Sequence, residues 1–104
     1  MWEITPVLIL EENAMPDLQA QFEKAAEDVM KLTSRPDDKT LLRLYGLYKQ
    51  ATEGNIKGKR PGFTDVKGRA KYDAWSRLRG KSGEWAMAAY VKLVEELQQG
   101  TDSG

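Results

Sequence analysis

The chain has 104 residues, a length that accommodates one small domain. Hydrophobic residues make up 40% of it and charged residues 31%, a balance typical of a soluble globular protein and not of a disordered one. Cysteine and histidine are both absent, which excludes disulfides, thiolate metal sites, thiol nucleophiles and histidine-based catalytic triads. Carboxylates and lysines remain available for catalysis, but this composition favours a binding module over an enzyme.

The charges balance overall, with 16 basic and 16 acidic residues, but they are unevenly distributed. Residues 1–17 carry four acidic residues and no basic one, whereas residues 54–81 carry nine basic residues against two acidic ones. A basic stretch in a neutral protein indicates an anionic partner of limited size. Charge alone leaves a second interpretation open, a solvated basic face without a ligand.

The first 17 residues differ from the rest of the chain. Their longest apolar run, residues 7–10, is far shorter than the roughly 20 residues that cross a bilayer, and no basic region precedes it as in a signal peptide. Together with the lack of cysteine, these features predict a cytoplasmic location. We expect residues 1–17 to be an N-terminal extension, either docked on the following domain or an appendage outside it.

A helical period begins at Leu18 and predicts a first helix that ends before Pro36. A second helix follows, with Asp37 or Asp38 as its N-cap and Gly54 as its C-cap. The apolar positions of the first helix recur at spacings of three and four, at residues 18, 22, 25, 26, 29 and 32.

Residues 54–65 form a basic, glycine-containing connection that is long for a helical bundle, so we expect it to be either functional or mobile. A third helix is predicted over about residues 66–79, with Gly80 as its stop. A fourth begins after a Ser82 N-cap and frays towards residue 100, leaving residues 101–104 as a flexible tail. Four helices with almost no strand signal predict an all-α bundle, with one domain at residues 18–100.

Tyrosine and lysine side chains on these helices are the candidate ligand-binding groups. Tyr45 and Lys49 are four residues apart and share a helix face, Lys71 belongs to the third helix, and Tyr90 belongs to the fourth. A tyrosine ring stacks on a purine and its hydroxyl donates to phosphate, while lysine supplies a compact cation. For each lysine taken singly a solvated surface position is the default, and for Tyr90, which lies on the apolar stripe of its helix, a half-buried place in the core is the commoner explanation.

Residues 45–52 (YGLYKQAT) resemble the signature of the acyl-CoA-binding protein family. Other segments resemble that family in order and at the right spacing: residues 22–27 its first helix, 60–62 its long loop, 68–75 its third helix, and 86–91 and 94–97 its fourth. The resemblance covers about residues 18–99, nearly the whole predicted domain.

The resemblance implies an antiparallel, up-down-down-up four-helix bundle that binds medium- or long-chain acyl-CoA esters and performs no chemistry. Its function would be to buffer and transport acyl-CoA inside the cell as part of lipid metabolism, with no cofactor and no metal. We expect a monomer that meets acyl-CoA-using enzymes or membrane surfaces only transiently.

The same resemblance implies a set of ligand contacts. They are Tyr45, Lys49 and Lys71 for the 3′-phosphate of the adenosine, Tyr90 for the nucleotide, the backbone near Ala26 for the adenine, and Leu41, Leu42, Leu44 and Tyr48 for the acyl chain or the edge of its groove. Met30 stands where many members of the family carry a basic residue near the phosphates or thioester. This departure predicts one weaker polar contact and favours a contact with the acyl chain.

Two other functions are weighed against this one. A helical interaction module for polyanions or proteins would use the basic stretch and would bind nucleic acid in a strongly salt-dependent manner. No RNP-like segment, zinc-finger spacing or glycine-rich phosphate loop is present, so we expect no nucleic-acid partner. An acyl-CoA hydrolase is disfavoured because no nucleophile–base pair is visible in the sequence.

Overall fold

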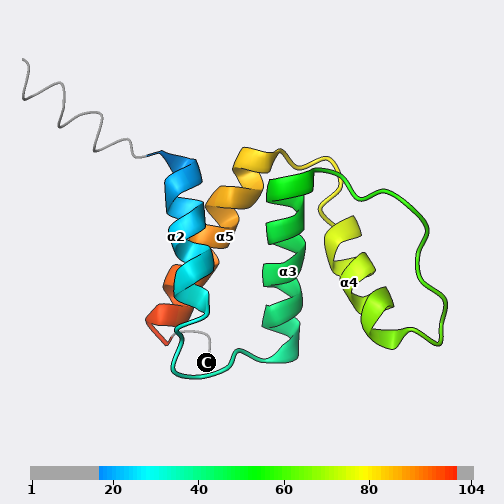
Figure 1. Cartoon of the computed structure of the whole chain (residues 1–104), viewed down its shortest axis with the longest axis horizontal. Helices are drawn as coiled ribbons and strands as arrows, with labels where there is room; N and C mark the ends of the chain where they lie inside the picture. Colours follow the sequence, from blue (N-terminus) through cyan, green and yellow to red (C-terminus); the bar gives the residue numbers. More distant parts are fainter. Residues whose placement is uncertain (1–16, 101–104) are drawn as a thin grey trace, which may run out of the picture.

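The computed structural model describes residues 17–100. Within that range it contains four α-helices and no strand: α2 (Leu18–Val29), α3 (Asp38–Glu53), α4 (Val66–Ser76) and α5 (Gly83–Gln98) (Figure 1). The predicted all-α architecture is therefore confirmed. Residues 1–16 and 101–104, and with them almost all of the predicted extension and the predicted tail, lie outside the described residues. Among the described helices, none is both long and apolar enough to cross a membrane.

The helices begin at the residue types expected of N-caps. The side chains of four residues accept a hydrogen bond from a backbone N–H in the first turn that follows them, namely Asp17, Asp37, Asp65 and Ser82. Of the two candidates for the second predicted helix, Asp37 is thus the cap, and the N–H of Thr40 that it binds lowers the pKa of its carboxyl group. Gly54 ends α3 with a φ of 78°, a left-handed conformation that glycine adopts without strain.

The third predicted helix is shorter than expected. The sequence predicts it to residue 79, but α4 ends at Ser76 and the chain continues in tight turns to Gly80. The N–H groups of Leu78 and Arg79 bond three residues back, to Trp75 and Ser76, at 3.0 and 3.2 Å. This tightening of the last turn is common at helix ends, where carbonyl groups lack their usual partners.

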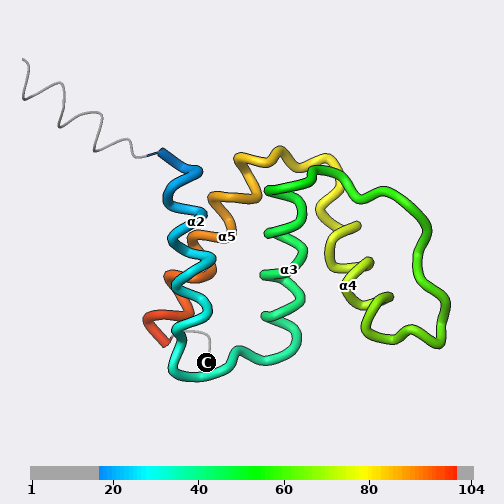
Figure 2. The backbone as a smooth tube through the Cα atoms, in the orientation of Figure 1, coloured from blue at the N-terminus to red at the C-terminus, as the bar shows by residue number. Residues whose placement is uncertain are grey.

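The topology is up-down-down-up, as predicted. Figure 1 shows α2 and α5 running in one direction and α3 and α4 in the other. Helix α5 packs against both α2 and α3, while α4 packs against α3. The connection between α3 and α4 returns along the length of α4, which is what allows these two consecutive helices to be parallel (Figure 2).

The core lies between α2, α3 and α5. Its buried members include Phe22 and Ala25 from α2, Leu44 and Leu47 from α3, and, from α5, Ala86, Tyr90, Leu93, Val94 and Leu97. Helix α5 supplies most of this set because its apolar positions recur every three or four residues and form one continuous stripe.

A buried amide ties the loops at one end of the bundle together. Gln50 is only 1% exposed, and its Nε2 donates to the carbonyl of Lys81 at 2.8 Å and to Oδ1 of Asn55 at 2.9 Å. The same Asn55 oxygen accepts from the N–H of Gly80 at 2.8 Å. These bonds fix the start of the α3–α4 connection against the α4–α5 turn, so they hold the parallel α3–α4 pair in place.

Candidate functional site

Helices α3 and α4 approach each other closely at Gly46. A Cβ atom at this position would lie 2.7 Å from the carbonyl oxygen of Ala74, a distance that real Cβ atoms do not adopt. The glycine therefore permits the two backbones to pack side by side. This contact brings the candidate residues of α3 next to those of α4.

Two lysine side chains reach from one helix of the α3–α4 pair to an aromatic ring of the other. The Nζ atom of Lys71, from α4, lies 5.4 Å from the ring centroid of Tyr45 in α3. The Nζ atom of Lys49, from α3, lies 5.0 Å from the ring centroid of Trp75 in α4. Each cation thus rests on an aromatic ring of the opposite helix, an arrangement worth about 0.5–1 kcal/mol at exposed sites. The three predicted phosphate ligands, Tyr45, Lys49 and Lys71, are brought together.

The Lys49 ammonium group also has an acidic partner one turn away. It donates to the carboxylate of Glu53, and this hydrogen bond raises the pKa of Lys49. A pKa raised above its already high normal value keeps the lysine charged at neutral pH. An anionic ligand that binds Lys49 would share it with Glu53 or displace that carboxylate.

An aromatic cluster joins the three core helices near this junction. Phe22 of α2 stacks on Tyr48 of α3 with ring centroids 5.3 Å apart, and the Tyr90 ring of α5 meets the edge of Phe22 at 5.1 Å. Tyr48 is exposed, whereas Tyr90 is only 4% exposed and its pKa is raised by burial. Tyr90 therefore lies in the core, as one of the two interpretations of the sequence expects. Its contact with a nucleotide stays a prediction.

The apolar candidates line α2 and α3 at different depths. Ala26 and Leu41 are half-buried and pack on the core, Leu42 is half-buried, and Leu44 is itself a core residue. Met30, the C-cap of α2, is 84% exposed. The assignment of these residues to an acyl chain stays a prediction, and Leu44 is the member of the set that presents the least surface to a ligand.

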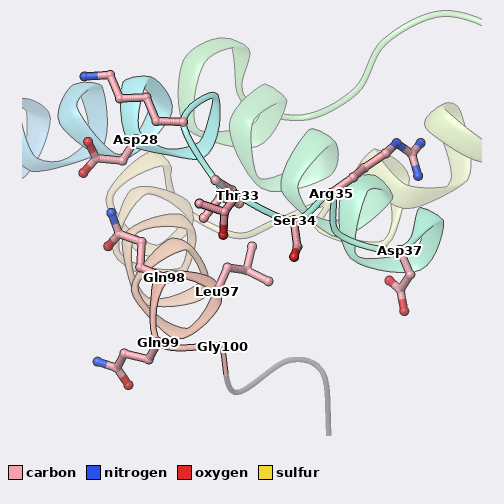
Figure 3. A pocket seen from close by; sticks show the side chains of 11 residues that line it. Asp28, Thr33, Ser34, Arg35, Asp37, Leu97, Gln98, Gln99 and Gly100 are labelled. Atoms are coloured by element: carbon pink, nitrogen blue, oxygen red, sulfur yellow. The ribbon is translucent and has the colours of Figure 1, made fainter.

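Two pockets are lined by none of the ten candidate residues. The larger, of about 760 Å³, is bounded by the last turn of α2, the α2–α3 connection and the end of α5. Figure 3 shows Leu97 extending towards Thr33 and Ser34 across it. Asp28 at its rim pairs with Lys24 at 2.7 Å, and this contact lowers the pKa of Asp28. A second pocket, of about 130 Å³, runs along α2 and α5.

A family profile described as "Acyl CoA binding protein" matches residues 19–94. The chain belongs to the acyl-CoA-binding protein family. The matched range contains α3 and α4 completely, α2 except its first residue and α5 except its last four residues, and it includes every candidate residue.

Individual members of the family are similar to this chain in sequence and in fold. The chain is 50% identical to an acyl-CoA-binding protein of Brassica napus over 80 residues, which cover 77% of this chain and 87% of that protein. Its fold is similar to the crystal structure of acyl-CoA-binding protein 2 of Oryza sativa, with a TM-score of 0.77 and 44% identity over 81% of this chain and 91% of that one. It is also similar to the crystal structure of an acyl-CoA-binding protein from Moniliophthora perniciosa, with a TM-score of 0.75 and 38% identity over 81% of this chain and 83% of that one. The family is one of binding proteins, and its ligand is acyl-CoA.

One residue of the junction was not anticipated as part of a site. Trp75 is half-buried, its Nε1 donates to the carbonyl of Gly54 at 2.8 Å, and its ring lies beneath Lys49. Trp75 thereby links the end of α3, the long connection and a candidate phosphate ligand. Its spacing from Lys49 in the sequence gives no sign of this contact. Within the described residues, no group of acidic side chains is arranged to hold a metal ion.

Proposed function

We propose that this chain binds acyl-CoA through the junction of α3 and α4, with the 3′-phosphate of the ligand between Tyr45, Lys49 and Lys71. The observation that carries the proposal is the convergence of two ammonium groups from different helices on one face, each next to an aromatic ring. A phosphomonoester carries a charge of about −1.5 to −2 at neutral pH, so two lysines match it. The ring of Tyr45 offers a face for stacking and its hydroxyl offers a hydrogen bond.

The acyl chain would lie between α2 and α3. Both helices pack closely on α5, whereas their own backbones stay further apart and meet through the Phe22–Tyr48 ring contact. Ala26 and Leu41 border this region, with Met30 at the end of α2 as a further apolar contact. Removing an acyl chain from water contributes roughly 0.8 kcal/mol per methylene, so ten methylenes contribute on the order of 8 kcal/mol before ordering costs. Chain length would then dominate affinity and the phosphate would supply specificity.

A site that binds the phosphate at one place and the acyl chain at another suits a carrier better than an enzyme. The proposed site offers cations, aromatic rings and apolar surface, which bind both the ester and its nucleotide without activating a nucleophile. We propose that the chain buffers and transports acyl-CoA esters in the cytoplasm, as a monomer and without catalysis.

The phosphate assignment is tested with two ligands that differ only at the 3′ position. Palmitoyl-CoA and its 3′-dephospho analogue are titrated into the original chain, Lys71→Ala and Lys49→Ala. Each variant is expected to bind palmitoyl-CoA more weakly by about 1.5–3 kcal/mol, the value of a hydrogen bond to a charged group, and to bind the dephospho analogue like the original chain. Equal losses for both ligands would contradict the assignment, and Lys92→Ala, on an exposed position of α5, is the matched control.

A further inference from the structure

The indole of Trp75 contacts two different segments of the chain. Its Nε1 donates to the carbonyl of Gly54 at 2.8 Å, and the Nζ atom of Lys49 lies 5.0 Å from the centroid of its ring. Lys49 supplies one of the two ammonium groups of the proposed phosphate site. The single hydrogen-bond donor of Trp75 is already engaged by Gly54, so any effect of Trp75 on a bound phosphate is transmitted by Lys49.

The ring is held at both ends. At its backbone end, the carbonyl oxygen of the preceding residue, Ala74, packs against Gly46, where an added Cβ would lie only 2.7 Å from it. At its indole end, the accepting carbonyl belongs to Gly54, the C-cap of α3, whose N–H bonds to the carbonyl of Gln50 at 3.1 Å. The position of the Trp75 ring is therefore fixed by contacts that do not involve a ligand.

The ammonium group of Lys49 is drawn in two directions. The carboxylate of Glu53, one turn further along α3, accepts a hydrogen bond from it, and the ring of Trp75 attracts it from α4. The side chain of Lys49 is only 25% exposed, so most of its length is covered by protein. Removing the ring would leave the attraction of Glu53 without this counterweight from α4.

An aromatic ring can orient a cation without cancelling its charge. The attraction comes from the quadrupole of a neutral ring, so the lysine keeps its full positive charge for an anionic ligand. A carboxylate in the same place would neutralise the ammonium group and compete with a phosphate for its N–H donors. Lysine also loses much side-chain freedom when it binds a ligand, and a lysine that is held in advance loses less.

We infer that Trp75 is a positioning residue for the phosphate site: its ring holds the ammonium group of Lys49 at the α3–α4 junction and thereby strengthens the selection of ligands that carry a 3′-phosphate. This role rests on the proposed function, because that function assigns the phosphate to Lys49. A cation–ring contact at an exposed site changes an equilibrium constant by about two- to fivefold, and an effect of this size on affinity is expected.

Two substitutions at residue 75 separate the ring from its anchor. Trp75→Phe and Trp75→Leu both remove the indole N–H that donates to Gly54, but only Trp75→Phe keeps an aromatic ring. Each variant is titrated with palmitoyl-CoA and with its 3′-dephospho analogue, at a temperature at which circular dichroism shows both variants to be folded. Trp75→Leu is expected to bind palmitoyl-CoA about two- to fivefold more weakly than Trp75→Phe. Both variants should bind the dephospho analogue equally, a split that a loss of stability alone would not produce.

Two lysine backgrounds complete this test. In the Lys49→Ala background, Trp75→Phe and Trp75→Leu should bind palmitoyl-CoA equally, because the ring has no cation to hold. In the matched Lys71→Ala background the difference should remain, since Lys71 lies over Tyr45 and not over Trp75. A difference that persists without Lys49, or that is as large for the dephospho analogue, would overturn the inference. Equal binding of the two ligands by the original chain would instead refute the proposed phosphate site, and the role of Trp75 with it.

Proton NMR of the ligand-free original chain tests the contact without any substitution at residue 75. The ring current of Trp75 is expected to move the ε-methylene protons of Lys49 upfield of those of the exposed Lys92. Lys81, whose Nζ lies 4.8 Å from the centroid of the Trp85 ring, is the positive control. A Lys49 signal at the position of Lys92 would overturn the inference, and because no ligand is present this result does not depend on the proposed function.

Discussion

Replacing Glu53 by glutamine removes the carboxylate to which Lys49 donates and leaves a side chain of the same size. In the proposed complex the ligand phosphate competes with this carboxylate for the ammonium group. The substitution is therefore expected to tighten binding of palmitoyl-CoA, whereas most substitutions at a binding site weaken it. The expectation rests on Lys49 being the phosphate ligand, so it tests that role without removing the lysine.

The size of the gain follows from the exposure of the pair. The side chains of Lys49 and Glu53 are 25% and 53% exposed, so solvent screens their attraction. Exposed ion pairs contribute about 0.2–1 kcal/mol. Release of Lys49 should then tighten binding by roughly 1.4- to 5-fold, with the larger value at low ionic strength where screening is weakest.

Isothermal titration with palmitoyl-CoA at low and high salt measures this gain. Glu95→Gln removes the same unit of negative charge from an exposed position near the far end of α5 and serves as the control. In the Lys49→Ala background, Glu53→Gln should give no gain, because the group that it releases is gone. Unchanged or weaker binding by Glu53→Gln, or a gain that persists without Lys49, would refute the reasoning.

Three further substitutions test the scaffold that forms the site. Gly46→Ala is expected to lower the free energy of unfolding by about 1–3 kcal/mol in urea denaturation, because the new Cβ meets the carbonyl of Ala74 and overpacking outweighs the gain in helix propensity. Gln50→Ala should cost about 1–3 kcal/mol in the same assay, because it leaves the carbonyl of Lys81 without its buried donor. Hydrogen bonding to Arg60 lowers the pKa of Asp73 below the usual value of 3.8 for an aspartate, so this carboxyl binds fewer protons in the folded state than in the unfolded one. Stability from this pair is present above about pH 4 and declines as the pH falls further, and Asp73→Asn should remove that part of the pH dependence of the melting temperature.

Each of these substitutions has a control and a contrary outcome. Gly62→Ala adds the same methyl group where nothing lies within 4 Å, so a loss of stability equal to that of Gly46→Ala would contradict the close-approach explanation. Asn55→Ala removes the second acceptor of Gln50, so a neutral result for both variants would show that the buried network contributes nothing. Glu95→Gln is the charge-matched control for the pH profile, since it removes a carboxylate from an exposed position of α5, outside the Arg60–Asp73 pair. A profile that shifts equally in both variants would count against the Arg60–Asp73 pair.

Much of the fold is predictable from local sequence signals. The spacing of apolar residues after Leu18 and the caps Asp37, Gly54 and Ser82 locate the helices, because capping and amphipathic periodicity are local properties of the chain. The end of α4 is the exception: its last turn tightens, and Gly80 bonds to Asn55 from a different loop. Sequence periodicity carries no information about such a contact.

The candidate site also has one part that is predictable from local sequence and one part that is not. The shared face of Tyr45 and Lys49 follows from a spacing of four residues, and the structure agrees with it. The positions of Lys71 over Tyr45 and of Lys49 over Trp75 depend on the approach of α4 to α3 at Gly46, which is a tertiary event. Resemblance to the family implied a role for Lys71, whereas no local pattern would have placed Trp75 beneath Lys49.

The most direct test of the account is a titration of the chain with palmitoyl-CoA, with free CoA and palmitate titrated alongside. The proposed site divides its binding energy between a phosphate-binding junction and an apolar region, so each fragment satisfies only one part. Tight binding of the ester, weak binding of CoA and little binding of palmitate are the predicted results. Absence of binding to palmitoyl-CoA, or binding of palmitate as tight as that of the ester, would contradict the account.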